Sequence, residues 1–172
     1  MEAALHHVRR GKSALSNTSE RIVYMSDPLF FKDDIRWRED SPMCHMVKAG
    51  DFLWLSGIVA LDENRKVVGA GDIQAQARQV FAIMRRVLSL ASCDLTSVIR
   101  LTNYLTVSFD DMEQTNKYWD VRREFFGTHR PASTGVKVAA LMLPELLIEI
   151  DAIAYAPNVV INPSAVIPNA KK

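Results

Sequence analysis

The sequence has 172 residues, of which 48% are hydrophobic and 24% are charged, which suits one compact domain with a sizeable core and does not require a second domain. The formal net charge is +1, and the basic residues are spread along the chain, which disfavours nucleic acid as a partner. No apolar run approaches the roughly 20 residues that a membrane-spanning helix needs, so we expect a soluble protein without membrane contact.

Three segments are predicted: an N-terminal extension (1–41), one domain (42–156) and a C-terminal tail (157–172). The first 19 residues have three basic residues and a single acid, a weak similarity to an organelle transit peptide. Neither end has enough apolar residues for its own core, so each is expected to pack on the domain or on a neighbouring subunit. Cys44 and Cys93 are expected to be reduced, because nothing indicates export, and we expect a cytoplasmic protein.

The first half of the domain is predicted to begin with a hairpin. Residues 21–25 of the extension are compatible with a short strand. Residues 52–59 are predicted to form a strand between two groups of turn residues, Gly50-Asp51 and 62–64, and residues 44–48 are its expected hairpin partner.

Two amphipathic helices are predicted. Asp72 is a good N-cap, and apolar residues then recur at intervals of three and four as far as Ala91. The second helix is expected to begin at Asp111 and to run to Phe126, where Gly127 ends it.

The remaining strands are predicted at 97–107, 134–141 and 146–155. In the first of these, alternation places four apolar side chains on the buried face: Ile99, Leu101, Leu105 and Val107. In the last, the same alternation places Glu149 and Asp151 opposite Ile148 and Ile150.

This order of elements predicts an α+β fold with a single sheet and both helices on one face, because each helix has one apolar stripe to cover. The other face of the sheet stays open and is expected to carry Trp54 and Tyr104. A half-covered sheet usually associates with other subunits, so an oligomer is expected.

Residues from about 41 to 156 resemble the RidA (YjgF) family of reactive-intermediate deaminases. The similarity rests on five segments in order: residues 50–57, residues 72–80, Phe125-Phe126, Arg130-Pro131-Ala132, and residues 146–154. The resemblance implies a chorismate-mutase-like fold and a homotrimer with a central barrel and ligand clefts between subunits. It also implies hydrolysis of an enamine or imine to a carbonyl compound and ammonia, without a metal or organic cofactor.

The chain departs from the deaminase pattern at four positions. Ser133 stands where the deaminases have an arginine that clamps the substrate carboxylate, and Gly135 stands where they often have cysteine. Met43 replaces a frequent tyrosine, and Trp119 stands at the position of an expected asparagine. These differences predict a wider and less cationic cleft than one for 2-iminopropanoate, with Met43 and Trp119 in its wall.

Glu149 occupies the family's acidic position on the last strand, which implies that it orients or deprotonates water. Without the resemblance, Glu149 and Asp151 read as solvated strand residues. Ser56-Gly57 lies at the end of a strand, where glycine lets a ligand approach a backbone N–H that can bind an oxyanion. The alternative for this pair is a simple strand exit.

Ser133 and Thr134 are candidate catalytic hydroxyl donors in place of the missing arginine, and the alternative is loss of function by drift. Arg130 is a candidate source of the missing charge, although Arg-Pro before a strand is common as plain structure. Trp119 fits either the core or the cleft wall.

No metal or organic cofactor is expected. The histidines have no ligand spacing typical of a zinc or iron site. The segment Gly69-Ala70-Gly71 lacks the third glycine of a dinucleotide-binding fingerprint.

Two hypotheses follow for the function. The first is a hydrolytic deaminase for an enamine or imine larger than a simple amino-acid derivative, such as an aminomuconate-type intermediate. The second is a non-catalytic trimer of the same fold that binds a small metabolite, because a fold does not fix a function.

Overall fold

One mixed seven-stranded sheet with two long helices makes up the computed structural model, which describes residues 27–33, 41–159, 161 and 163–167. The strands are β1 (Leu29–Phe31), β2 (Met46–Ala49), β3 (Phe52–Val59), β4 (Val98–Leu105), β5 (Ala132–Lys137), β6 (Ile148–Tyr155) and β7 (Val166–Ile167). The helices are α1 (Ile73–Ser89) and α2 (Met112–Phe126).

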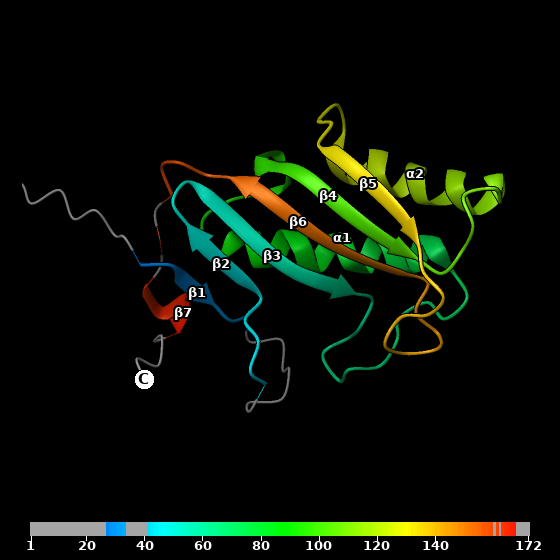
Figure 1. Cartoon of the computed structure of the whole chain (residues 1–172), viewed down its shortest axis with the longest axis horizontal. Helices are drawn as coiled ribbons and strands as arrows, with labels where there is room; N and C mark the ends of the chain where they lie inside the picture. The colour runs from blue at the N-terminus through cyan, green and yellow to red at the C-terminus, as the bar shows by residue number, and fades with distance from the viewer. Residues whose placement is uncertain (1–26, 34–40, 160, 162, 168–172) are drawn as a thin grey trace, which may run out of the picture.

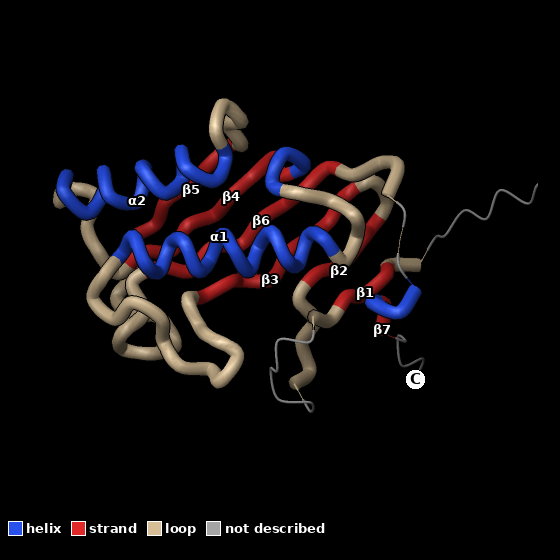
Figure 2. Tube along the Cα trace, turned by 180° about the vertical axis from the view of Figure 1, so that it is seen from behind, coloured by secondary structure: helices blue, strands red, loops and turns tan. Residues whose placement is uncertain are grey.

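Both helices cover the same face of the sheet. Figure 1 shows the strands in front of α1 and α2, and Figure 2, seen from behind, shows the helices in front of the strands. The strand order is β5-β4-β6-β3-β2-β1-β7, in which β4 and β5 are parallel and the other neighbours are antiparallel. The α+β prediction with two helices on one face is therefore confirmed.

The helix boundaries follow from their caps. The Asp72 carboxylate accepts hydrogen bonds from the backbone N–H groups of Gln74 and Ala75 at the start of α1. The carboxylate of Asp111 caps α2 in the same way, and Gly127 ends that helix at a φ of 55°, in the left-handed region. Helix α1 ends at Ser89, two residues before the predicted end.

The core lies between the helices and the covered face of the sheet. The residues of α1 that pack there include Val80, Phe81 and Met84, none of which is exposed. Phe81 meets Phe126 of α2 edge to face, with 5.2 Å between the ring centroids. The two helices thus share one core.

The predicted orientation of Ile99 is wrong, because its side chain is 42% exposed. The pairing of β4 with β6 shifts register between Val98 and Arg100. This bulge inserts an extra residue, so that Val98 and Leu101 are both buried while Ile99 and Arg100 are exposed. Leu101 and Leu105 face the core as predicted.

Strand β5 occupies 132–137 rather than the predicted 134–141. All six of its residues are exposed, because β5 is the edge strand beside β4. An edge strand with both faces exposed shows little alternation of apolar and polar residues, so its bounds are hard to predict from the sequence.

Parts of both chain ends add to the sheet beyond the core domain. Strand β1 pairs with β2 and with β7, so that Phe30 lies opposite Val47 and Ile167. These described parts of the extension and the tail pack on the parent sheet. The strand expected at 21–25 lies outside the described residues.

The uncovered face of the sheet is rich in apolar side chains. Trp54 is 50% exposed there, as predicted, and the rings of Phe52 and Tyr155 lie 5.5 Å apart. Val136 of the edge strand is also exposed, but it lies opposite Tyr104, which in turn lies opposite Glu149, so polar residues separate it from this group. We call Phe52, Trp54 and Tyr155 the apolar face.

Gln76 of α1 ties together three parts of the chain. Its side chain is fully buried, and its Nε2 donates to the carbonyl oxygens of Gly69 (3.1 Å) and Glu145 (2.7 Å). Its Oε1 accepts from the backbone N–H of Leu147 at 2.7 Å. One amide therefore joins the loop before α1 to the loop that leads into β6.

Replacing Gln76→Leu is expected to lower the free energy of unfolding by about 2–5 kcal/mol, because it leaves buried backbone groups without partners. Chemical denaturation measures this value. Gln74→Leu is the matched control on the same helix. The side chain of Gln74 donates a long hydrogen bond of 3.5 Å to the carbonyl oxygen of Lys117, so the effect should stay below about 1 kcal/mol. Equal effects of the two substitutions would contradict the role given to Gln76.

Candidate functional site

A cavity of about 160 Å³ lies between the segment before β2, strand β3 and the start of β6. It brings together four residues singled out in the sequence, namely Met43, Ser56, Gly57 and Glu149. The other lining residues are Ser41, Cys44, His45, Val59 and Met142. We call this space the Glu149 cavity.

Glu149 lies directly over Gly57. A Cβ atom added to Gly57 would be 2.0 Å from Oε1 of Glu149, so the close approach requires glycine. The pairing of β3 with β6 shifts register between Leu55 and Ile58, which places Ser56 and Gly57 at an irregularity in the strand. The sheet is thus shaped here to accommodate a carboxylate.

Buried and half-buried residues alternate along β6, and this alternation determines the environment of Glu149. Ile148 and Ile150 are fully buried under the helices, while Glu149 and Asp151 are half-buried on the opposite side, as predicted. Burial raises the pKa of Glu149, and the negative charge of Asp151 raises it further. Glu149 therefore exchanges its proton closer to neutral pH than an ordinary glutamate does, which suits general acid–base chemistry.

Asp151 has a second neighbour in Tyr104 of β4. The Tyr104 hydroxyl donates a hydrogen bond of 3.2 Å to Oδ2 of Asp151. The charge of Asp151 and this bond raise the pKa of Tyr104, so its hydroxyl remains a donor at neutral pH. Tyr104, expected on the open face, holds the Asp151 side chain on the same side of β6 as Glu149.

The side chains of Ser56 and Cys44 shape the polarity of the cavity. The Ser56 hydroxyl donates to the carbonyl oxygen of Cys44 at 2.7 Å, which leaves its own lone pairs to accept from a ligand. Burial raises the pKa of the Cys44 thiol, so this thiol is not a thiolate nucleophile at neutral pH. Both Cys44 and Cys93 are free.

His45 also lines the cavity, a role that was not predicted from the sequence. Its Nδ1 accepts a 2.9 Å hydrogen bond from the backbone N–H of Asp33, which places the proton on Nε2. Burial lowers the pKa of His45, and the imidazole is neutral at physiological pH. The available signal in the sequence was a polar residue, His45, between the apolar residues Cys44 and Met46 of the predicted hairpin.

Ser133 and Thr134 point to opposite faces of β5, so they do not form a single pair of donors. Thr134 accepts a long bond of 3.4 Å from the guanidinium of Arg100. Ser133 lies under α2, where its Oγ accepts from Arg122 Nη1 at 2.8 Å and from Asn103 Nδ2 at 3.0 Å. Neither hydroxyl lines the Glu149 cavity within one protomer.

A buried polar network holds Ser133 and the edge strand. Asn103 of β4 donates to the carbonyl oxygen of Thr134 at 2.7 Å and accepts at Oδ1 from the Tyr118 hydroxyl at 2.5 Å. Burial raises the pKa of Tyr118 to about 12, so it remains a donor. The sequence signal for this network was a polar Asn103 at an inward position between Leu101 and Leu105.

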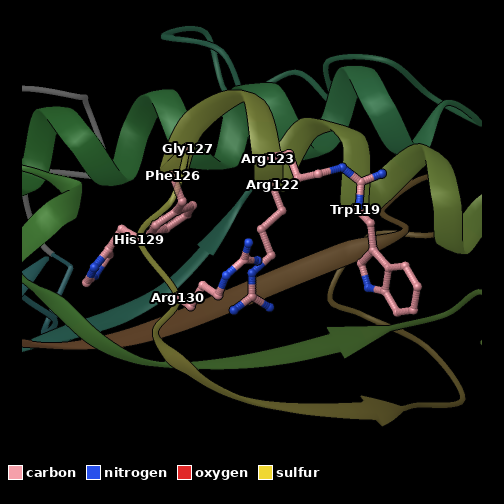
Figure 3. Close-up of a pocket in the computed structure, with 7 residues that line it drawn as sticks. All are labelled: Trp119, Arg122, Arg123, Phe126, Gly127, His129 and Arg130. Atoms are coloured by element: carbon pink, nitrogen blue, oxygen red, sulfur yellow. The ribbon is translucent and has the colours of Figure 1, made fainter.

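Trp119 and Arg130 line a second pocket, of about 240 Å³, at the end of α2 (Figure 3). Its other lining residues are Arg122, Arg123, Phe126, Gly127 and His129. No residue lines both spaces. Within one protomer the structure therefore separates Trp119 and Arg130 from Met43, Ser56, Gly57 and Glu149.

No group of three or more His, Cys, Asp or Glu side chains within the described residues is arranged to hold a metal ion. Over the same part of the chain, none of the helices combines the length and apolar character needed to cross a bilayer.

Comparison with known proteins gives matches along most of the chain. The family described as endoribonuclease L-PSP matches residues 39–156. A RutC family protein of Pyrococcus horikoshii is 38% identical over 114 residues, which cover 66% of this chain and 86% of the relative. The 3-aminoacrylate deaminase RutC of Acinetobacter baylyi is 35% identical over 115 residues, covering 67% and 87% respectively.

A solved structure agrees with these matches. The Mycobacterium tuberculosis protein Rv2704, described as a member of the YjgF/YER057c/UK114 family, superposes with a TM-score of 0.62 at 25% identity. The superposition covers 76% of this chain and 100% of the other.

The raised pKa of Glu149 predicts a stability effect of Glu149→Gln. The unfolded chain ionises this group at its ordinary pKa, so ionised Glu149 destabilises the folded state at pH values above its raised pKa. The variant should therefore melt at a higher temperature than the wild type at pH 8, and the difference should shrink as the pH falls towards 4.5. Thermal unfolding by circular dichroism across this range measures it.

Glu145→Gln provides the control, because Glu145 is exposed and no lining residue of the Glu149 cavity. Its melting temperature should follow that of the wild type at every pH. If the Glu149→Gln protein is no more stable than the wild type at pH 8, the ionised carboxylate does not destabilise the folded state and the prediction is wrong.

Proposed function

The chain belongs to the endoribonuclease L-PSP family, which includes a 3-aminoacrylate deaminase, and from this premise we propose that it hydrolyses a reactive enamine or imine. The resemblance to the RidA (YjgF) family is confirmed by the same matches. The observation that carries the proposal is a half-buried carboxylate of raised pKa, Glu149, held over a glycine in a small cavity.

The size of the cavity favours a small-molecule reaction over cleavage of RNA, although the family description names an endoribonuclease. Pockets for drug-sized ligands are typically about 300–1,000 Å³. The Glu149 cavity, at about 160 Å³, suits a metabolite of few atoms or the reacting end of a larger one.

The reaction adds one water molecule and releases one ammonia. Protonation of an enamine at carbon gives an iminium ion, and water then adds to the C=N carbon to form a carbinolamine. The carbinolamine collapses to a carbonyl compound as its amine leaves with a proton. In this proposal Glu149 accepts the proton of the attacking water and returns it to the leaving amine, which a carboxylate of raised pKa suits.

The other proposed roles follow from position. Gly57 and Ser56 line the cavity beside Glu149 on β3, and we assign the backbone N–H of Gly57 to a substrate oxygen atom. The Ser56 hydroxyl, whose proton goes to Cys44, is assigned as an acceptor for a substrate N–H. Met43, 56% exposed, and Met142, 63% exposed, give the cavity adaptable apolar walls. These walls favour an unsaturated substrate larger than 2-iminopropanoate, such as an aminomuconate-type enamine.

Ser133 has a different proposed role from the one suggested by the sequence. Its hydroxyl holds the Arg122 guanidinium and does not line the Glu149 cavity, so it is a positioning residue. Thr134 remains a candidate hydroxyl donor on the uncovered side of the sheet.

We also propose that the protein is a homotrimer that buries the apolar face. Exposed patches of this kind mark interaction sites, and Trp54 lies at the centre of this one, between Val47 and Ile153 on the neighbouring strands. Burial in a trimer would also place ligand clefts between subunits, in line with the resemblance to RidA.

Glu149→Gln is expected to lower ammonia release at least about 100-fold, because it removes the proton acceptor for water. The assay uses freshly generated 2-aminoacrylate, 3-aminoacrylate and 2-aminomuconate. Gly57→Ala should lower the rate by about 10- to 100-fold, because the added Cβ displaces the carboxylate. Glu145→Gln should leave the rate unchanged.

If no enamine loses ammonia faster with the wild-type protein than in buffer, the deaminase proposal is wrong. A trimer that still binds such compounds without turnover would then support the second hypothesis, a non-catalytic binding protein.

Trp54→Glu is expected to dissociate the trimer, because it places a charge in the centre of the apolar face. Light scattering after gel filtration should give three times the 19.4 kDa chain mass for the wild type and the mass of one chain for the variant. Met112→Glu, an exposed position at the start of α2, is the control and should remain trimeric. A monomeric wild type at micromolar concentration would exclude the proposed trimer.

A further inference from the structure

We propose that the N-terminal extension is a functional part of the Glu149 cavity, because its residues Phe31 and Asp33 hold His45, which in turn positions Ser56. His45 is then a positioning residue, since it acts on the reaction through Ser56. This role rests on the proposed function of the cavity. It also goes beyond that function, because Asp33 lies outside the segment 39–156 that matches the family.

His45 is bonded to the extension at two atoms. Its backbone N–H donates to the carbonyl oxygen of Phe31 at 2.9 Å, and its ring Nδ1 accepts from the backbone N–H of Asp33 at 2.9 Å. Burial lowers the pKa of His45, so the imidazole is neutral and keeps the lone pair that the second bond requires. The backbone and the ring of His45 are therefore both fixed by the extension.

The same segment is bonded to the strand that lines the cavity. The backbone N–H of Ser56 donates to the carbonyl oxygen of His45 at 3.0 Å. The hydroxyl of Ser56 donates to the carbonyl oxygen of Cys44 at 2.7 Å. Ser56 is thus held at its backbone and at its side chain. Gly57, the proposed donor to a substrate oxygen atom, is the next residue of β3.

Ser56 depends on these bonds because it lies where the regular pairing of β3 is interrupted. The registered pairs of β2 and β3 end at Met46 and Leu55. On the other side of β3, the pairing with β6 shifts register between Leu55 and Ile58. A residue at such an irregularity is not fixed by the ladder of the sheet, so its remaining hydrogen bonds determine its position.

Asp33 is anchored to the helical layer by an ion pair. Its Oδ2 accepts from Nε of Arg86 on α1 at 2.6 Å, and only 4% of the Asp33 side chain is exposed. A carboxylate buried to this degree needs a charged partner. Phe31, two residues earlier, is fully buried in the core. The end of the extension is therefore fixed between the central helix and the wall of the cavity.

A double-mutant cycle on the full chain tests the inference. Asp33→Ala removes the anchor and keeps the backbone N–H, while His45→Leu removes the acceptor of that N–H. Each substitution should lower kcat for enamine hydrolysis by about tenfold and change KM by less than about threefold, because the groups that contact the substrate remain but are less well positioned. The double variant should be no slower than the slower single variant, since both substitutions break the same connection.

His45→Asn tests whether the acceptor at Nδ1 matters rather than the ring as a whole. The amide oxygen of asparagine offers an acceptor close to the position of Nδ1. This variant should therefore retain at least about half of the wild-type kcat, whereas His45→Leu should not. Equal losses in the two variants would contradict the role given to the bond with Asp33.

Amide hydrogen exchange gives a measurement that does not need turnover. The N–H of Ser56 should exchange at least about tenfold faster in Asp33→Ala and in His45→Leu than in the wild type, because its acceptor is less firmly held. The N–H of Asn103, in the middle of β4 with a paired strand on each side, reports global unfolding. The acceleration at Ser56 should exceed any acceleration at Asn103 by about tenfold.

Two further variants separate the effect of the anchor from the effect of a damaged fold. Arg86→Gln breaks the same ion pair from the side of α1 and should reproduce the effects of Asp33→Ala. Asp27→Asn is the matched control, because Asp27 is an exposed acid of the same extension. It should leave both kcat and the exchange at Ser56 as in the wild type.

The outcomes distinguish this inference from the deaminase proposal. If the wild type turns over no enamine but exchange at Ser56 responds as expected, the deaminase proposal is wrong and the positioning by the extension stands. Wild-type exchange at Ser56 in Asp33→Ala, Arg86→Gln and His45→Leu overturns the inference. In an active enzyme, wild-type kcat in these three variants also overturns it, as do losses from Asp33→Ala and His45→Leu that multiply in the double variant.

Discussion

The buried amide of Gln76 is the contact on which the candidate site depends. It bonds to Gly69 before α1, and to Glu145 and Leu147 before β6. Because Glu149 follows Leu147 by only two residues, the position of its carboxylate is set by a side chain of the central helix. A polar group at the centre of a core is costly unless every bond is made, and here both ends of the amide are satisfied.

Coverage of one face of the sheet explains the rest of the arrangement. The helices bury the inward residues of β4 and β6, which leaves Glu149, Asp151 and Tyr104 on the side that carries the apolar face. Glu149 thus lines the Glu149 cavity and shares its side of the sheet with the apolar face. Partial burial of this kind raises the pKa of a carboxyl group without removing it from water.

The features that were predicted correctly from the sequence are those determined by residues close together in the chain. Asp72, Asp111 and Gly127 determine helix ends through bonds to residues at most four positions away. The predicted orientation of Ile99 was wrong, because the bulge in β4 exists only in the pairing of this strand with β6. Arg122 was missed for a related reason: its contact with Ser133 depends on how α2 crosses β5, and no pattern within either segment encodes that crossing.

The contact between Gly57 and Glu149 makes the two positions mutually dependent. Any side chain at 57 must displace the carboxylate of Glu149, so the functional cost of a mutation there depends on which residue stands at 149. The effect of one substitution therefore depends on the residue present at the other, which is epistasis with a steric origin. A relative that has lost the acid would be free to replace the glycine, and the pair would be expected to change in that order.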